Sequence, residues 1–391
     1  MRNAWKLDRM QGAILVPFSI AALISLVTGI RHAIEYHCHD LQWMGVRLVG
    51  QGIDPWQEEL ARFPHHYDHF VTPNYLHSLY LLLFPFGLLS FESAEIVWTA
   101  TTVILSIICV LMLQSLFHLS RFHTLLALCL LWMSSPFRVT LEVGQMSFFE
   151  LFFLTGAFLA ASTALGGLSF GVSLAKYSFS PAAVMLFLFR GRLRFLLYAA
   201  VVPLVGLVGV WLLVKTPFLK LALEPLAVSA SPTAVSPGFA DLMTLLEQTL
   251  KSHVSHARQL AYAIGLFGSA AYALLLSRFR LSRSAEFTLI SIASLFFVKH
   301  LVYDYIFLVV LLCFALTQES RKIKGILLGG VLTFWFLLPL LDRSSLHDTN
   351  TYLAINCCLL ALLLIFTTYL VTKATGAPSP VPSTETLTTA S

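Results

Sequence analysis

Charged residues are scarce in this chain of 391 residues. Asp, Glu, Lys and Arg make up 12% of the sequence, hydrophobic residues make up 57%, and the mean hydropathy is +0.79. Soluble globular domains carry about 25% charged residues, so this composition excludes an ordinary soluble domain. The sequence instead predicts a polytopic integral membrane protein.

Other absences narrow the class further. No small-residue cleavage pattern follows the first apolar run, Ala13 to Ile30, so an uncleaved membrane span is expected there and not a removed signal peptide. The net charge is only +5 and the basic residues fall in short loops, so no nucleic acid partner is expected. No periodic repeat is visible, and no cofactor is expected. The six cysteines lie mostly within apolar runs, where they behave as small apolar residues.

Apolar runs predict an all-α transmembrane bundle of about 11 to 13 helices, because a crossing helix needs roughly 17 to 25 residues. Two of the runs, 124–135 and 286–298, are too short to cross cleanly. They are expected to be half-spans around an internal cavity, since non-helical backbone at membrane depth is tolerated only where protein or water covers it. The predicted runs are 11–30, 72–90, 93–118, 124–135, 143–163, 166–189, 194–215, 257–277, 286–298, 302–317, 324–341 and 350–372.

Basic clusters predict the orientation of this bundle. They all fall on one side if the spans alternate, and the positive-inside rule makes this side the cytoplasm. Two large loops, 31–71 and 216–256, then face outward within a single domain of residues 1–373. The tail, 374–391, is rich in Pro, Ser and Thr and is expected to be disordered. The clusters are Arg2/Lys6/Arg9, Arg190/Arg192/Arg194, Arg278/Arg280/Arg283 and Arg321/Lys322/Lys324.

The first outward loop concentrates ionisable residues and carries two helix signals. Asp40 precedes LQWMGVRLV, an amphipathic segment suited to a membrane interface, and Gly50 and Gly52 follow it. Asp54 precedes Pro55, which suits the first position of a second short helix. Helix capping is therefore one interpretation of both aspartates. Asp40 has the stronger claim to chemistry, because it follows the first span directly.

Two His-rich groups in this loop, HCHD at 37–40 and HHYDH at 65–69, contain side chains that bind zinc. Neither spacing matches a zinc signature such as CxxC or HExxH. A solvated, histidine-rich loop is the simpler interpretation, and no metal site is predicted.

Lys176 lies inside residues 166–189, an otherwise apolar stretch long enough to cross a bilayer. An ammonium at that depth costs about 2.5 to 3.5 kcal/mol, so it is expected to face a cavity or a partner instead of lipid. A cation in a water-filled cavity is a candidate ligand for an anion. Two alternatives stay open: the side chain snorkels to an interface, or it pairs with a carboxylate such as Glu150.

Four groups of motifs, in order along residues 36–315, resemble glycosyltransferase family 87, the polyprenyl-phosphate-mannose-dependent mannosyltransferases of the GT-C superfamily. Ser147 departs from this pattern, because the family's Gly-Gln-x-Asn segment has Asn there. The motifs are Asp40 with GIDPW and Thr72-Pro73-Asn74-Tyr75; Val143-Gly144-Gln145-Met146-Ser147; Gly171 to Pro181 with Lys176 and the basic turn Phe189 to Arg194; and His300 with Tyr303-Asp304-Tyr305.

The resemblance implies a GT-C fold in a bacterial plasma membrane and an active site on the outer face. It implies transfer of a sugar, with inversion, from a polyprenyl-phosphate donor to a glycan or glycolipid acceptor, using a first-loop carboxylate as general base. Asp40 matches that position, and a base must be ionised and within hydrogen-bond reach of the acceptor hydroxyl. The leaving phosphate needs cations or preset donors. Its candidate ligands are Lys176, His300 and Lys299, and the substrate-binding candidates are Tyr75, Asn74, Gln145, Asp54 and Asp304.

Several alternatives stay open from sequence. Mannose follows from the resemblance alone, and arabinose or another pentose is an alternative donor sugar. The acceptor is a lipid-linked glycan, a glycolipid, a cell-wall polymer or a protein. A lipid or solute transporter would also show broken spans and buried charge, although transporters commonly reveal two similar halves. A scaffolding membrane protein would not need Lys176 at depth.

Overall fold

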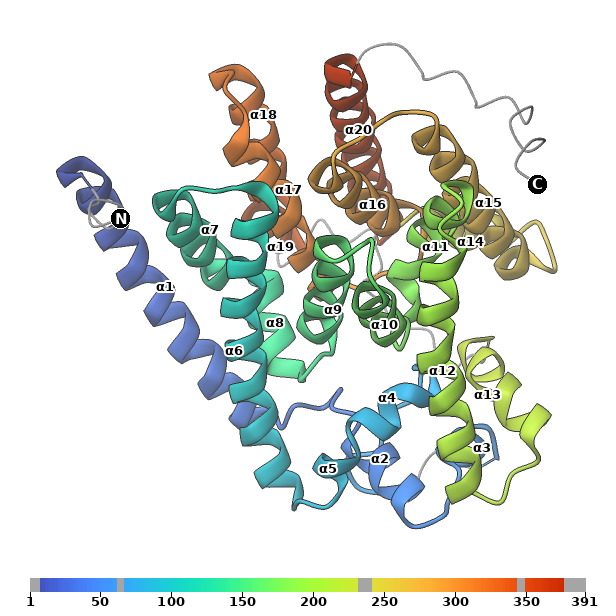
Figure 1. Cartoon of the computed structure of the whole chain (residues 1–391). Helices are drawn as coiled ribbons and strands as arrows, with labels where there is room; N and C mark the ends of the chain where they lie inside the picture. The colour runs from blue at the N-terminus through green and yellow to red at the C-terminus, as the bar shows by residue number, and fades with distance from the viewer. Residues whose placement is uncertain (1–7, 62–66, 231–240, 343–348, 376–391) are drawn as a thin grey trace, which may run out of the picture.

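The computed structural model describes residues 8–61, 67–230, 241–342 and 349–375, and every regular element named in these ranges is a helix (Figure 1). The predicted all-α bundle is therefore confirmed. The end of the tail, from residue 376, lies outside the described residues. So do Arg2 and Lys6 of the first basic cluster and His65 and His66 of the second His-rich group.

Six helices of the described chain are long and apolar enough to cross a membrane. Asp8 caps the first of them through a hydrogen bond of 2.7 Å from the Gln11 backbone N–H. The six are α1 (Arg9–Glu35), α6 (Phe91–Phe117), α12 (Leu193–Leu213), α15 (Ala257–Ser277), α20 (Thr349–Thr375) and the continuous run of α18 (Arg321–Leu332), η4 (Thr333–Leu337) and α19 (Leu338–Asp342).

Two further spans are broken. Helix α7 (Arg121–Met133) meets α8 (Ser135–Val143) at an angle of 59°, and the break falls where Ser134 caps α8 and Pro136 lies in its first turn. Helix α10 (Ala164–Ser173) is followed by η1 (Tyr177–Phe179) and α11 (Ser180–Phe189), and this pair is bent by 114°. Counting each bent pair as one span gives up to eight crossings by length and composition.

The remaining predicted spans are shorter helices: α9 (Ser147–Leu159), α16 (Arg283–Phe297), α17 (Leu308–Thr317) after η3 (Val302–Phe307), and α4 (His77–Leu82) with α5 (Phe84–Gly87). Each is below the roughly 17 residues that a crossing helix needs. The expectation of about 11 to 13 membrane helices therefore counted apolar segments that do not reach crossing length, because hydropathy alone does not show where a helix ends.

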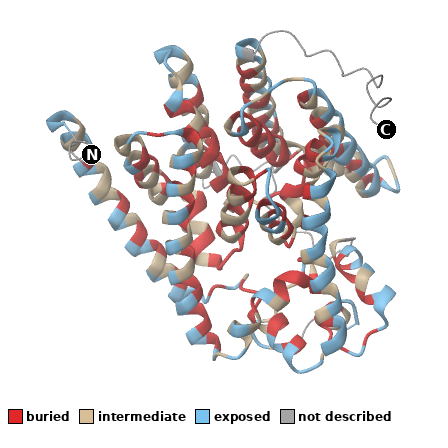
Figure 2. Cartoon of the chain, in the orientation of Figure 1, coloured by how far each residue is buried: buried red, intermediate tan, exposed pale blue. Residues whose placement is uncertain are grey.

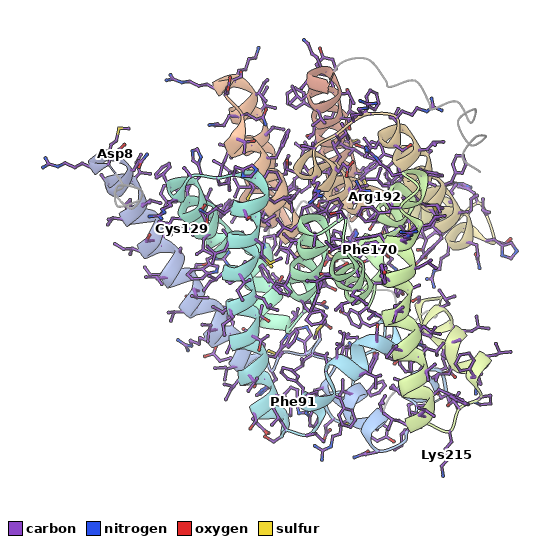
Figure 3. All side chains as sticks on the ribbon, viewed as in Figure 1. Asp8, Phe91, Cys129, Phe170, Arg192 and Lys215 are labelled. Carbon is purple, nitrogen blue, oxygen red and sulfur yellow. The ribbon has the colours of Figure 1, made fainter. Side chains whose placement is uncertain are left out.

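The long helices present apolar side chains outward. Val16, Ile20 and Val27 on α1 and Leu204 and Leu212 on α12 are exposed. Figure 2 shows these outer helices largely pale blue and tan, with the buried residues gathered at the centre. Extensive exposed apolar surface of this kind suits contact with lipid. Figure 3 places Arg192 and Lys215 at opposite ends of α12, so the apolar length of this helix lies between two charges.

Helix α10 packs closely against α12 because it carries glycine on the facing side. A Cβ on Gly171 would lie 2.4 Å from the Ala199 carbonyl oxygen, and one on Gly167 would lie 2.7 Å from the Phe195 carbonyl oxygen. Small residues let two backbones approach in this way in membrane helices. The close approach fixes the C-terminal end of α10, after which the chain turns to Lys176.

Short helices collect at one end of the bundle. Helices α2 (Trp43–Gly50), α3 (Pro55–Ala61) and α13 (Phe218–Ala230) lie there with α4 and α5, opposite the ends of α1, α16 and α18 that carry basic residues (Figure 1). The predicted loop 216–256 is thus largely helical in its described part, since it contains α13 and α14 (Leu242–Leu250). The two short helices predicted in the first loop are confirmed.

Candidate active site

A cavity of about 280 Å³ opens between the first loop, the bend of α10 and α11, and the segment before α17. Of the nine residues predicted for the site, Asp54 is the one that does not line it. The others come from distant parts of the sequence and share this cavity: Asp40, Asn74, Tyr75, Gln145, Lys176, Lys299, His300 and Asp304. Convergence of this kind is the geometry that a substrate site requires.

Asp40 marks one side of the cavity. Its backbone N–H donates to the Val143 carbonyl over 2.8 Å, and its Oδ2 accepts a hydrogen bond of 2.8 Å from Gln145 Nε2. Helix α2 begins after Gln42, and its N-cap has no side-chain hydrogen bond. The interpretation of Asp40 as a helix cap is therefore wrong. The carboxylate is turned away from α2 and toward the cavity.

The turn before Asp40 has an unusual backbone. His37 and Cys38 both have positive φ, at 58° and 36°, immediately after α1 ends. Left-handed conformations in residues other than glycine cost on the order of 1 to 3 kcal/mol each and persist only where the surroundings impose them. Here Cys38 is buried, and its N–H donates to the Ala33 carbonyl over 3.3 Å. This turn directs the chain so that Asp40 meets the end of α8.

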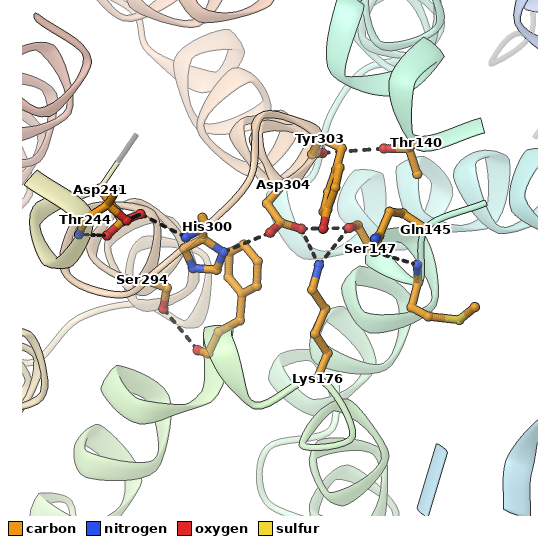
Figure 4. Close-up of polar contacts among 12 residues, drawn as sticks. Thr140, Gln145, Ser147, Lys176, Asp241, Thr244, Ser294, His300, Tyr303 and Asp304 are labelled. Atoms are coloured by element: carbon orange, nitrogen blue, oxygen red, sulfur yellow. Dashed lines mark hydrogen bonds and ion pairs between the residues drawn. The ribbon is translucent and has the colours of Figure 1, made fainter. Parts of the chain in front are cut away.

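Lys176 and Asp304 form an ion pair on the other side of the cavity, with side chains only 12% and 3% exposed. Lys176 Nζ also donates to Ser147 Oγ over 2.9 Å, and Ser147 Oγ donates to Asp304 Oδ1 over 2.7 Å (Figure 4). The predicted cation therefore has a partner, and its hydrogen-bonded carboxylate is Asp304 instead of Glu150. An ammonium has three N–H donors. Two of them form hydrogen bonds to described residues, and the ammonium also lies 5.1 Å from the centre of the Tyr303 ring.

His300 extends this cluster. Its Nδ1 lies 3.0 Å from Asp304 Oδ2, so Asp304 binds both the histidine and the lysine. Its ring packs against Phe179, with centroids 4.1 Å apart. The other ring nitrogen, Nε2, is buried and has no hydrogen-bond partner among the described residues, although the side chain lines the cavity. Because Nδ1–H donates to the Asp304 carboxylate, Nε2 of the neutral ring is an acceptor, and it becomes a donor to a ligand only when the ring is an imidazolium.

Asp241, which the sequence did not single out, supports His300 from α14. It caps that helix through Thr244 N–H over 2.8 Å, and its Oδ2 accepts the His300 backbone N–H over 3.1 Å (Figure 4). Burial raises the pKa of this carboxyl to about 7, against hydrogen bonds that lower it. The sequence signal that was available is an aspartate directly before an amphipathic segment, which is typical of a helix N-cap.

The short segment Gln145–Met146–Ser147 joins the two sides. Gln145 binds Asp40, and Ser147 binds both Lys176 and Asp304. Ser147 stands where the family pattern has Asn, and its hydroxyl both accepts from the lysine and donates to the carboxylate. Residues 145–147 therefore fix the position of Asp40 relative to the ion pair of Lys176 and Asp304.

Asp54 lies elsewhere. Its Oδ1 accepts the backbone N–H groups of Trp56 and Gln57 over 3.0 and 3.2 Å, which is the N-cap arrangement predicted as one interpretation. Its Oδ2 accepts a hydrogen bond from the Thr216 hydroxyl. The carboxylate thus joins α3 to the chain before α13. Its hydrogen bonds are accounted for without a substrate.

No group of three His, Cys, Asp or Glu side chains in the described ranges is arranged to hold a metal ion. His37 is 3.8 Å from Glu95, and the His69 ring stacks on Phe91 with centroids 3.7 Å apart. These contacts explain His37 and His69 by pairing and packing.

Comparison with known proteins identifies the family. Among curated proteins no match is found. The model of glycosyltransferase family 87 matches residues 78–303, which is more than half of the chain and includes Gln145, Lys176 and His300. This match favours a transferase over the transporter alternative. With its helices of membrane-crossing length and a cavity lined by a carboxylate and cationic side chains, the chain belongs to glycosyltransferase family 87 and is a membrane glycosyltransferase.

Proposed function

We propose that this glycosyltransferase moves a sugar, mannose, from a polyprenyl-phosphate donor to a lipid-linked or cell-envelope glycan, with inversion at the anomeric carbon. One observation carries the proposal. A carboxylate, the Lys176 ammonium and the His300 imidazole line the same cavity, and residues 145–147 link Asp40 to the pair of Lys176 and Asp304. Inverting transfer needs a base on the acceptor side and charge stabilisation on the leaving-group side.

Asp40 is the proposed general base. The Gln145 amide binds Oδ2, and no hydrogen bond from a described side chain reaches Oδ1. This oxygen takes the proton from the acceptor hydroxyl while the hydroxyl oxygen bonds to the anomeric carbon. The bond from that carbon to the phosphate oxygen breaks at the same time, and the phosphate leaves with the electron pair.

Lys176 and His300 are the proposed ligands of the leaving phosphate, and Lys299 lies at the same wall. Asp304 keeps both groups in place and offsets part of the lysine's charge. Preset donors of this kind stabilise the growing negative charge without reorganisation during the reaction. Asn74 lines the same cavity and is the proposed contact of the transferred sugar and the acceptor, whereas the hydroxyl of Tyr75, the other substrate-binding candidate, is engaged by Gln145.

The proposed location follows from the basic residues. Arg9, Arg283 and Arg321 begin helices at the end of the bundle opposite α2 and α3. If the positive-inside rule applies, the first loop and the mouth of the cavity face outward from a bacterial plasma membrane.

The test is incubation of the purified protein with polyprenyl-phosphate mannose, arabinose and glucose and a membrane glycolipid extract, scored for release of polyprenyl phosphate. The mannose carrier is expected to be consumed, and the Asp40→Asn variant is expected to bind it without turnover. Consumption of a nucleotide sugar, with every polyprenyl-phosphate sugar left intact, would contradict the proposed donor.

A further inference from the structure

Gln145 was predicted to contact substrate, but both ends of its amide are engaged by protein groups. Nε2 donates to Asp40 Oδ2 over 2.8 Å, and Oε1 accepts from the Tyr75 hydroxyl over 2.9 Å and from the Met146 backbone N–H over 3.3 Å. Gln145 and Tyr75 are both buried, with exposed fractions of 4% and 5%. The contacts suggest a role that acts through Asp40.

Only one orientation of this amide satisfies its surroundings. The Met146 N–H can only donate, so it requires the amide oxygen on its side. An ionised carboxylate can only accept, so it requires the amide NH₂ group. The Tyr75 hydroxyl adds a second donor to the oxygen, and the Tyr303 side chain also interacts with Gln145. The flipped amide would set an oxygen against the Asp40 carboxylate and an NH₂ group against the Met146 N–H.

The backbone around Gln145 is equally constrained. Gly144 ends α8 with φ of 73°, and a Cβ there would lie 2.8 Å from the Cβ of Cys38. The Trp98 indole N–H donates to the Gly144 carbonyl over 3.0 Å, and the Asp40 N–H donates to the Val143 carbonyl over 2.8 Å. The turn at 143–145 is thus attached to the turn that carries Asp40, so amide and carboxylate cannot shift independently.

We propose that Gln145, with its amide oriented by Tyr75, is a positioning residue that binds Oδ2 of Asp40 and presents Oδ1 to the acceptor hydroxyl. This inference rests on the proposed role of Asp40 as general base. A base is effective only when its accepting oxygen lies within hydrogen-bond reach of the proton it removes. Small misplacements of a reacting group lower rates by up to about 10²-fold.

The test uses two variants that disturb the amide in different ways. In Gln145→Glu, a second carboxyl replaces the amide beside Asp40, and two adjacent carboxyls share a proton. The acid limb of the turnover-against-pH profile is expected to move to higher pH. In Tyr75→Phe, the hydroxyl that orients the amide is removed, and turnover is expected to fall about five- to tenfold, the equivalent of one net hydrogen bond. The KM for polyprenyl-phosphate mannose is expected to stay within about twofold in both variants, as for loss of an interaction made in the transition state.

Tyr80→Phe is the matched control. The Tyr80 hydroxyl donates to Gln42 Oε1 over 2.9 Å, so it forms the same type of bond to the same type of side chain, and Tyr80 is fully buried. This bond does not involve the side chain of Asp40, although Gln42 lines the same cavity. Tyr80→Phe is expected to show wild-type turnover and an unchanged pH profile.

The outcomes separate this inference from the proposed function. Loss of turnover in Asp40→Asn together with a wild-type pH profile in Gln145→Glu would overturn the positioning role and leave the base intact. Wild-type turnover in Asp40→Asn would overturn the base itself. If Gln145→Glu does not fold, equal turnover in Tyr75→Phe and Tyr80→Phe overturns the inference. A lower turnover in Tyr75→Phe that disappears when Asp40 is already Asn supports it, because coupled residues are not additive.

Discussion

Asp40 and Asp54 stand in the same predicted loop, and each precedes a short helix, yet their surroundings differ completely. Asp54 accepts hydrogen bonds from the first turn of its own helix and from Thr216. Asp40 takes no part in capping α2, and its carboxylate is held by Gln145 from another part of the chain. The comparison teaches that both oxygens of the structural carboxylate are filled, one by its own helix and one by Thr216, whereas Gln145 fills only one oxygen of Asp40.

The largest expected effect separates the two aspartates directly. Asp40→Asn should lower turnover by about 10² to 10⁴, the range for losing a general base, with little change in donor affinity. Asp54→Asn should leave turnover close to that of the wild type, because Asn also caps helices well. Turnover and donor affinity of the two purified variants, measured side by side with polyprenyl-phosphate mannose, check this. Equal losses of turnover in the two variants would show that Asp40 and Asp54 do not differ in role.

Lys176→Met tests the cationic side of the cavity, opposite Asp40. The variant loses a charge-assisted contact to phosphate of about 1.5 to 3 kcal/mol, so donor affinity should fall tenfold or more. Insertion no longer carries the cost of a cation at depth, but Asp304 is left buried without its ammonium partner, so the folded variant should also lose stability. Lys176→Arg should restore the binding only partly, since its guanidinium is planar and larger. Unchanged donor binding in Lys176→Met would mean that the lysine only pairs with Asp304 and does not bind the phosphate.

Asp54→Ala tests the structural member of the pair. Loss of an N-cap costs about 1 kcal/mol, so the unfolding temperature in detergent should fall by a few degrees. The turnover of the folded fraction should stay that of the wild type. Asp54→Asn is the matched control and should unfold near the wild-type temperature. A loss of turnover without loss of stability would mean that Asp54 contacts substrate after all.

The smallest expected effect is a pH dependence of the contact between α3 and α13. Burial, and then the neighbouring Asp54, raise the pKa of Glu224 to about 8, against the opposing Lys220 at 4.0 Å. A carboxyl with a raised pKa favours the folded state fully below its ordinary value of 4.5, and this stability is lost as the pH rises through about 8.

Hydrogen exchange of α13, corrected for the intrinsic effect of pH, should therefore show falling protection between about pH 5 and 8 and little further change above it. Glu224→Gln is neutral throughout and should remove the dependence. A decline of the same size in Glu224→Gln would place the sensitive group elsewhere. His77, which packs on Trp56 of α3, would act in the opposite direction, because burial lowers its pKa to about 4 and its contribution to stability therefore increases as the pH rises.

Sequence patterns predicted the helical class, the two short helices of the first loop and the set of residues that meets at the cavity. They did not predict how those residues pair. The partner of Lys176 is Asp304, which lies 128 positions further along the chain, and hydropathy periodicity contains no information about such a contact. Capping was one interpretation of Asp40 and is wrong, because the left-handed turn at His37 and Cys38 brings Asp40 to the end of α8 before α2 begins. The sequence gives little sign of this turn, because it contains no glycine.

The bend of 114° between α10 and α11 has a consequence for how the protein is made. Each arm has only 10 residues, so neither is long enough to leave the translocon as a stable crossing helix. The glycine face of α10 finds its partner in α12, which is synthesised afterwards. The arms therefore reach their final position only after α12 has entered the membrane. Lys176 lies at the bend between the two arms. Its charge is paired only after Asp304 has been synthesised, later than α12.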